Sequence, residues 1–363
     1  IKLKYMLREL FLAVLITLIV CQCKKDNNSN CTNPSDVIIG VDLSTYPEIV
    51  GDNGIYFNNQ NEEINVLQFL NDKGVNTVRL KLWHSPDNEH ASLTEVTTFS
   101  NELREYGFKI WLDFHYSDSW ADPANQIIPQ EWSTCDYETL SDSIYNYTYN
   151  VISLINPDLV QIGNEINNGF LHPIGHYSEM EQFKSLIDTA CKAVRNYNNQ
   201  IEIMLHYAGH EGSIHFFNHF QFIDYDLIGL SYYPKWHGKS LDSLDITMNS
   251  LHDMYNKNIV VAETAYPFTL AWNDYTHNVI GSEEQLILPD FPATAQGQYD
   301  FMQEIKRISI NQHNGNNGFC YWGGEMIAWK GYQALDGSSW ENLALFDFQS
   351  KALPVIDAFC ISQ

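Results

Sequence analysis

Positive charge is scarce in this sequence. Its 363 residues include 20 Lys and Arg against 45 Asp and Glu, which gives a formal net charge of −25 at pH 7. A chain this acidic repels phosphate backbones, so the composition argues against nucleic-acid binding, and it disfavours anionic substrates. Charged residues amount to 18% and aromatic residues to 13%. Few charges and many aromatic rings suit a neutral, hydroxyl-rich ligand such as a glycan, although an aromatic core would give the same composition.

No segment reaches the roughly 18 consecutive apolar residues that a membrane-spanning helix needs. The run Leu10–Val20 is shorter and follows three basic residues, Lys2, Lys4 and Arg8. This order of a basic region and a short apolar run predicts a secretory signal peptide.

Two cysteines, Cys21 and Cys23, directly follow the apolar run. The arrangement resembles the signal of bacterial lipoproteins, whose first mature residue is a lipid-modified cysteine, and Cys23 suits that role slightly better. We therefore expect residues 1–23 to be a signal peptide of the lipoprotein type and residues 24–36 to be a flexible tether. An ordinary signal peptide is the alternative. Both predict an exported protein, either secreted or held at the bacterial outer membrane or cell surface by its lipid anchor alone.

The other five cysteines form no CxxC pair and show no zinc-ligand spacing. No disulfide pairing can be deduced from them. Cys191 and Cys320 lie in apolar contexts, so we expect them to be buried free thiols.

Eight short apolar runs follow residue 37 and alternate with longer helical patterns. Nearly continuous apolar runs are typical of parallel strands that are covered on both faces. The expected strands are Ile38–Leu43, Thr77–Leu82, Lys109–Phe114, Leu159–Ile162, Ile201–His206, Leu227–Ser231, Ile259–Ala262 and Gly318–Tyr321.

The expected helices are Glu62–Lys73, Leu93–Tyr106, Tyr137–Ile155, Met180–Tyr197, Leu241–Asn256 and Thr294–Gln312, with a poorly marked one within Ile214–Phe222. Eight strand–helix repeats predict an α/β protein with a single (β/α)8 TIM-barrel domain over residues 37–363. The alternative, a doubly wound open sheet, would need a glycine-rich phosphate loop after an early strand, and the sequence has none.

Two glutamates stand at the ends of expected strands, where TIM barrels carry their active sites. Glu165 follows the fourth strand and Glu263 follows the seventh, and these strands face each other across a barrel. Carboxyl groups reaching inward there can approach to about 5–5.5 Å, the separation used in retaining glycoside hydrolysis. One carboxylate would attack the anomeric carbon while the other protonates the leaving oxygen. Two unrelated glutamates that cap loops are the alternative interpretation.

Other residues at strand ends suit the surroundings of such a pair. Arg79 would keep the nucleophile ionised, and Tyr233 would donate a hydrogen bond to it. Asn164 suits the sugar 2-hydroxyl, and Trp322 suits the floor of the site. Further candidate partners of sugar hydroxyls are Asp113, His115 and His206. Because the two histidines lack a third ligand at metal spacing, we expect them to form hydrogen bonds.

The sequence resembles glycoside hydrolase family 53, the arabinogalactan endo-β-1,4-galactanases. The most specific motif is His115–Pro123, which reads His-Tyr-Ser-Asp-Ser-Trp-Ala-Asp-Pro. Further matching segments are Gly40–Ser44, Val78–Trp83, Trp111–Phe114, Val160–Gly169, Leu230–Pro234, Val261–Pro267 and Gly318–Trp322. The resemblance implies that Glu165 is the acid/base, that Glu263 is the nucleophile, and that catalysis needs no cofactor. It implies internal, retaining cleavage of β-1,4-galactan in type I arabinogalactan and pectin, and we expect a monomer.

Some bacterial members of that family join the loops after strands seven and eight through a calcium ion. The candidate ligands here are Asp274 and Asn278 in the first loop and Ser338 and Glu341 in the second. Trp272 stands where an acidic residue is expected and offers only its carbonyl. A solvated Asp/Asn turn without calcium is the alternative.

Two other functions are compatible with the sequence. One is a different retaining barrel endo-glycosidase, of the mannanase or cellulase type, with the same catalytic pair. The other is a non-catalytic glycan-binding lipoprotein, and the presence of both glutamates argues against it.

Overall fold

A computed structural model describes residue 31, residues 33–311 and residues 315–361. The chain divides into two compact units, Ile1–Cys31 and Thr32–Gln363. The predicted signal peptide and most of the predicted tether lie outside the described residues. Within the described ranges, no helix is long and apolar enough to cross a membrane.

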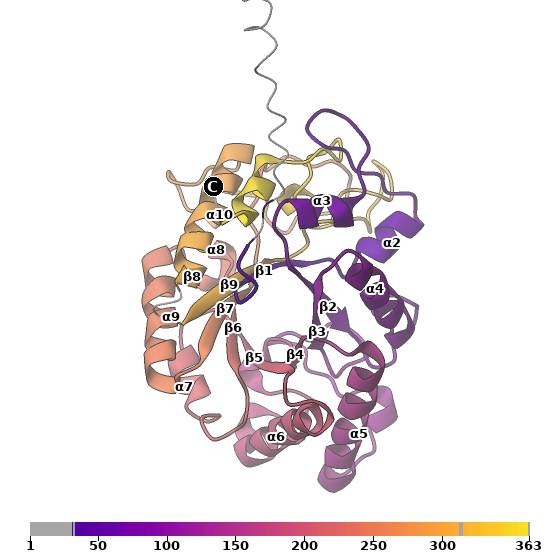
Figure 1. The fold of residues 1–363 in the computed structure, drawn as a ribbon, viewed down its shortest axis with the longest axis vertical. Helices are drawn as coiled ribbons and strands as arrows, with labels where there is room; N and C mark the ends of the chain where they lie inside the picture. Colours follow the sequence, from indigo (N-terminus) through magenta and orange to yellow (C-terminus); the bar gives the residue numbers. More distant parts are fainter. Residues whose placement is uncertain (1–30, 32, 312–314, 362–363) are drawn as a thin grey trace, which may run out of the picture. The chain divides into compact units, whose positions relative to one another are not determined.

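Eight parallel strands form a closed barrel, with the helices as an outer ring (Figure 1). The sheet order runs from β1 to β7 and then to β9, and β9 pairs back with β1. The predicted TIM barrel is therefore confirmed. The strands are β1 (Ile38–Asp42), β2 (Thr77–Leu82), β3 (Lys109–Phe114), β4 (Leu159–Ile162), β5 (Glu202–Ala208), β6 (Leu227–Ser231), β7 (Asn258–Thr264) and β9 (Asn316–Tyr321).

The helices of the described part are α2 (Tyr46–Gly51), α3 (Val66–Asp72), α4 (Leu93–Glu105), α5 (Tyr137–Ile155), α6 (Met180–Tyr197), α7 (Ser213–Phe217), α8 (Pro234–His237), α9 (Leu241–Tyr255) and α10 (Ala295–Ser309). Most bounds agree with the sequence prediction to within two residues.

Two helix bounds differ from the prediction. Helix α3 begins at Val66 instead of Glu62, because the Asn65 side chain accepts the backbone N–H of Gln68 and caps the helix there. Helix α10 ends at Ser309, and the next two residues form a short strand, β8, which pairs antiparallel with β9.

The barrel interior beneath the C-terminal strand ends is closed by a small apolar cluster made of strand residues alone. Its members are Ile38, Trp111, Leu159, Met204, Leu227, Val260, Ala262 and Cys320. Such an interior layer makes the barrel a packed core and not a pore. The Arg79 guanidinium lies above the cluster, 5.6 Å from the Trp111 ring centre, so the polar site begins directly on this apolar floor.

The described cysteines include both free thiols and disulfide-bonded residues. Cys191 and Cys320 are buried free thiols, as predicted. Cys31 is disulfide-bonded, and so is Cys360; no sequence feature marked either of them.

Candidate active site

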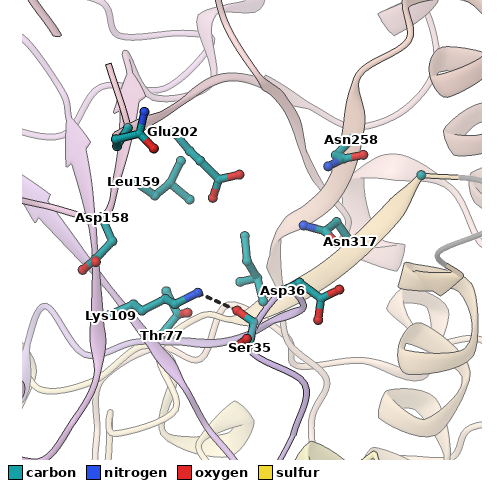
Figure 2. A pocket seen from close by; sticks show the side chains of 12 residues that line it. Ser35, Asp36, Thr77, Lys109, Asp158, Leu159, Glu202, Asn258 and Asn317 are labelled. Carbon is teal, nitrogen blue, oxygen red and sulfur yellow. Dashed lines mark hydrogen bonds between the residues drawn. The ribbon is translucent and has the colours of Figure 1, made fainter. Parts of the chain in front are cut away.

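A cavity of about 690 Å³ opens at the N-terminal end of the barrel strands (Figure 2). Its lining includes the first residues of six strands, namely Ile38, Thr77, Lys109, Leu159, Glu202 and Asn258. TIM-barrel enzymes carry their chemistry at the opposite, C-terminal end of the strands, and in this chain the buried charged side chains gather there.

Glu263 is aimed inward by an irregularity in the pairing of β6 and β7. Leu230 pairs with Val261, but the next residue, Ser231, pairs with Glu263, so β7 carries one extra residue. Such bulges re-aim side chains at the ends of barrel strands. The Glu263 carboxylate lies 2.8 Å from Arg79 and accepts a hydrogen bond of 3.1 Å from the Tyr233 hydroxyl. Both contacts predicted for these two residues are therefore confirmed.

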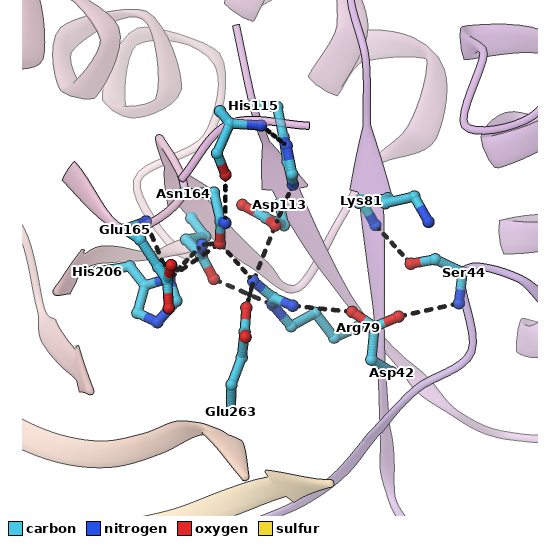
Figure 3. Close-up of polar contacts among 12 residues, drawn as sticks. Asp42, Ser44, Arg79, Lys81, Asp113, His115, Asn164, Glu165, His206 and Glu263 are labelled. Atoms are coloured by element: carbon cyan, nitrogen blue, oxygen red, sulfur yellow. Dashed lines mark hydrogen bonds and ion pairs between the residues drawn. The ribbon is translucent and has the colours of Figure 1, made fainter. Parts of the chain in front are cut away.

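Arg79 connects three acids beneath the site (Figure 3). Its guanidinium lies 2.8 Å from a carboxylate oxygen of each of Asp42, Asp113 and Glu263, and it donates to Asn164 Oδ1 at 2.9 Å. Burial opposes the ionisation of Asp113, but Arg79 and His115 outweigh it and lower the pKa of this carboxyl. The planar guanidinium is suited to hold several carboxylates in fixed positions.

Glu165 reaches the site through a sharp turn after β4. Gly163 has a φ of +78°, and a Cβ there would lie 2.5 Å from the Ile166 side chain, so the turn requires glycine. Glu165 itself has a φ of 46°, a left-handed conformation that costs energy for a residue with a side chain. Its Oε1 accepts a hydrogen bond of 2.6 Å from the Ser231 hydroxyl.

The two glutamates differ in their surroundings although the pKa of each is raised. Burial is the main cause for both, and the negative charge of Glu165 raises the pKa of Glu263 further. Such a pair takes up one proton between its members. Glu263 has an ion pair with Arg79 and a phenol donor, which stabilise its ionised form. The shared proton therefore belongs on Glu165.

Four residues predicted to bind sugar lie deeper than expected. Asp113 and His206 are fully buried, so neither side chain has exposed surface with which to contact a sugar. His115 is 2% exposed and bonds to Asp113 and to the backbone of Ala121. Both ends of the Asn164 amide are engaged, since its nitrogen donates to the Ala121 carbonyl at 2.8 Å and its oxygen accepts from Arg79.

Aromatic rings form a band across the C-terminal end of the barrel. Trp322 lies 5.8 Å from Trp120 and 4.5 Å from Trp340 between ring centres, Trp83 continues the band beyond Trp120, and Trp236 continues it beyond Trp340. Trp120 and Trp236 are 39% and 51% exposed. The band offers apolar faces of the kind on which sugar rings stack. Trp340 was not predicted, because it lies in a long loop without a strand to mark it.

Lys81 and Glu325 are two further buried ionisable residues, and the sequence predicted no role for either of them. The Lys81 ammonium lies 4.4 Å from the Trp120 ring centre and 5.4 Å from that of Trp83. Glu325 is 1% exposed, and its Oε2 is a buried oxygen without a hydrogen-bond partner. Lys81 lies two residues after Arg79 on β2, and this spacing puts both side chains on the same face of the strand, a signal that was available in the sequence.

The predicted calcium ligands hold three buried side-chain oxygens without hydrogen-bond partners: Asp274 Oδ2, Asn278 Oδ1 and Glu341 Oε2. The Ser338 hydroxyl, in contrast, donates to the Met326 carbonyl. Two carboxylates and an amide carbonyl are the oxygen ligands that calcium prefers, so these residues fit such an ion. In the part of the chain that the structure describes, no group of three His, Cys, Asp or Glu side chains is placed to hold a metal, and this set contains only two.

Comparison with known proteins agrees with this geometry. The model of the glycosyl hydrolase family 53 matches residues 38–359. The arabinogalactan endo-β-1,4-galactanase of Cellvibrio japonicus is 32% identical over 90% of this chain and 91% of its own length. The catalytic domain of an Ignisphaera aggregans family 53 protein is 36% identical, with a TM-score of 0.85 over 90% of this chain and 96% of that one. One of two structurally characterised fungal β-1,4-galactanases is 27% identical, with a TM-score of 0.77 over 88% and 98%.

The chain therefore belongs to glycosyl hydrolase family 53 and is a glycoside hydrolase with a (β/α)8 barrel.

Proposed function

We propose that this hydrolase is an endo-β-1,4-galactanase that cleaves the galactan of type I arabinogalactan and pectin with retention of configuration. The names of its relatives support the substrate class. The observation that carries the mechanism is the different setting of two carboxylates at one site. Glu263 is paired with Arg79 and Tyr233, whereas Glu165 has a single hydroxyl donor from Ser231.

In the first step Glu263 is the nucleophile. Its ionised carboxylate attacks the anomeric carbon and forms a glycosyl-enzyme ester, while the bond to the leaving oxygen breaks. Glu165 gives its proton to that oxygen, so the departing chain leaves as a neutral alcohol. Arg79 holds Glu263 ionised and oriented until the attack.

In the second step Glu165 is a carboxylate and acts as the base. It takes a proton from water as the water oxygen attacks the anomeric carbon, and the ester bond to Glu263 breaks. Two inversions at one carbon give net retention. Glu165 ends protonated and Glu263 ends ionised, so both are ready for another cycle.

The aromatic band would recognise the neutral sugar by stacking. Trp322, which is 8% exposed and follows β9, would form the floor under the sugar at the cleavage point, and Trp120 would extend the stacking surface. Asp113, His115 and Arg79 would support the site from below, as their burial indicates.

Calcium binding is part of the proposal. Asp274, Asn278 and Glu341 would hold the ion, since their unpartnered oxygens need a cation or water. The ion would brace the two loops that carry these residues and would take no part in the chemistry.

Export, a lipid anchor on Cys23 or Cys21, and a monomeric state are proposals that rest on the sequence alone. Mass spectrometry of the mature N-terminus, produced in a bacterium, tests the anchor, because a diacylglyceryl cysteine has a characteristic mass.

A substrate panel tests the proposed specificity. The purified protein is incubated with potato galactan, mannan and carboxymethylcellulose, and reducing ends are measured together with solution viscosity. We expect cleavage of galactan alone, with an early fall in viscosity that shows internal cleavage. Cleavage of mannan without cleavage of galactan would refute the proposed substrate and leave the hydrolytic mechanism standing.

A further inference from the structure

A short chain of hydrogen bonds lies behind Glu165. The Nε2 atom of His206 lies 2.9 Å from the Ser231 hydroxyl oxygen, which in turn lies 2.6 Å from Glu165 Oε1. His206 belongs to β5 and Ser231 is the last residue of β6, and both are fully buried. The two side chains thus approach the carboxyl group of Glu165 from within the barrel.

The second nitrogen of His206 sets the direction of these hydrogen bonds. Two donors point at Nδ1, which accepts from the Gln161 amide at 3.0 Å and from the backbone N–H of Glu165 at 3.3 Å. The third group near Nδ1 is Asn164 Oδ1 at 3.1 Å, an oxygen that already accepts from Arg79 and Gln161. Because Nδ1 accepts, the ring hydrogen is on Nε2 and is donated to Ser231. The hydroxyl of Ser231 then has its own hydrogen free to donate to Glu165. Burial, together with the positive charge of Arg79, lowers the pKa of His206 well below its usual value, so the ring is neutral.

Ser231 also fixes the position of Glu165 relative to Glu263. Through the β6–β7 bulge its backbone pairs with Glu263 on one side, while its side chain binds Glu165 on the other. Within the described residues, Ser231 is the only group that donates a hydrogen bond to the carboxylate of Glu165. One strand end therefore holds both acids.

We propose that Ser231 and His206 are positioning residues for Glu165. The hydroxyl of Ser231 donates a hydrogen bond to Glu165 Oε1, so the acidic proton of Glu165 is carried by Oε2. The same hydrogen bond stabilises the carboxylate that forms when Glu165 gives this proton away. His206 orients the hydroxyl. This inference rests on the proposed role of Glu165 as acid/base.

Several other groups bear on the proton affinity of Glu165. They are Arg79 of β2, Asp113 of β3, Asp122 after β3, His206 of β5, Tyr233 after β6 and Glu263 of β7. Burial raises the pKa of Glu165 most, and Ser231 is the first group that lowers it, ahead of Arg79. Loss of the hydroxyl is therefore expected to raise this pKa.

The pH dependence of kcat/KM tests the proposal with Ser231→Ala. A hydrogen bond to a charged group is typically strong enough to shift a pKa by about one unit, so the basic limb of the profile should move up by about one pH unit. Turnover of galactan should fall about tenfold, and turnover of an aryl β-galactobioside with a good leaving group should fall less. Ser231→Thr, which keeps the hydroxyl, should restore the basic limb toward its wild-type position.

Two further variants complete the test. His206→Phe keeps the Ser231 hydroxyl but removes the donor that orients it. It should move the basic limb in the same direction as Ser231→Ala, by a smaller amount. This variant preserves the test if Ser231→Ala does not fold. Ser100→Ala removes a buried hydroxyl that bonds to the Val96 carbonyl in α4, and it should leave the profile unchanged. An unmoved basic limb in both site variants, with equal losses on galactan and on the aryl substrate, would overturn the proposal.

Glu165→Gln separates this inference from the proposed function. If that variant keeps wild-type turnover of galactan, Glu165 is not the acid and both proposals fail. If it loses turnover of galactan but keeps that of activated substrates, while Ser231→Ala keeps the wild-type basic limb, then only the role of Ser231 and His206 is wrong.

Discussion

The guanidinium of Arg79 lies 2.8 Å from a carboxylate oxygen of Glu263, and both side chains are almost completely buried. The same guanidinium binds Asp42 and Asp113, so one cation compensates three acids above an apolar floor. A charge held in this way is costly to leave unpaired. The central ion pair therefore orients the proposed nucleophile.

Replacement of Arg79 should therefore damage both stability and catalysis. Arg79→Met leaves three buried carboxylates without their partner, and we expect a loss of about 3–5 kcal/mol in the free energy of unfolding. Urea denaturation and kcat/KM on galactan measure the two effects. Arg195→Met is the control, since this arginine pairs with the more exposed Asp224 and Asp226 and should cost about 1 kcal/mol or less. Equal costs for the two variants would contradict the account.

Tyr233→Phe should shift the acidic limb of the pH profile. The phenol donates to Glu263 Oε2 and stabilises the ionised carboxylate, so its loss raises the pKa of Glu263. A larger fraction of Glu263 is then protonated, and therefore inactive as a nucleophile, at a given low pH. The acidic limb of kcat/KM moves up by about one pH unit. Tyr232→Phe is the control, because that hydroxyl donates to the Gly238 carbonyl instead. A shift in the control alone would refute the assignment.

Lys81→Met should separate stability from activity. Burial lowers the pKa of Lys81, which shows that the folded protein holds this ammonium at a cost. The apolar variant should unfold at the wild-type temperature or above it, while kcat/KM on galactan falls about tenfold or more. Thermal unfolding and steady-state kinetics measure the two outcomes. A variant that is destabilised but fully active would show that Lys81 is structural.

Calcium removal should lower the melting temperature. EDTA leaves the oxygens of Asp274, Asn278 and Glu341 without a cation, and the loops that carry them should loosen. The effect should disappear in Glu341→Gln, which has lost one charged ligand, and persist in Asp336→Asn, whose side chain is 85% exposed. An unchanged melting temperature of the wild-type protein in EDTA would remove calcium from the account.

The sequence predicted the barrel well because each strand is a nearly continuous apolar run and each glutamate directly follows one. It could not predict the depth of Asp113 and His206, since strand-end position does not distinguish a side chain at the surface from one below it. The pairing of Ser231 with Glu263 depends on one extra residue in β7, and the apolar pattern of β7 does not mark that bulge. Trp340 joins the aromatic band from a loop, where no periodicity applies.

The central claim is that Glu263 forms a covalent bond with the sugar. The measurement is mass spectrometry of the protein after incubation with an activated 2-deoxy-2-fluoro-β-galactobioside, followed by digestion and sequencing of the labelled peptide. The account predicts one added fluoroglycosyl group per chain, on the peptide that contains Glu263 and on that residue. A label on Glu165, or an unlabelled protein that releases galactan products of inverted configuration, would contradict it.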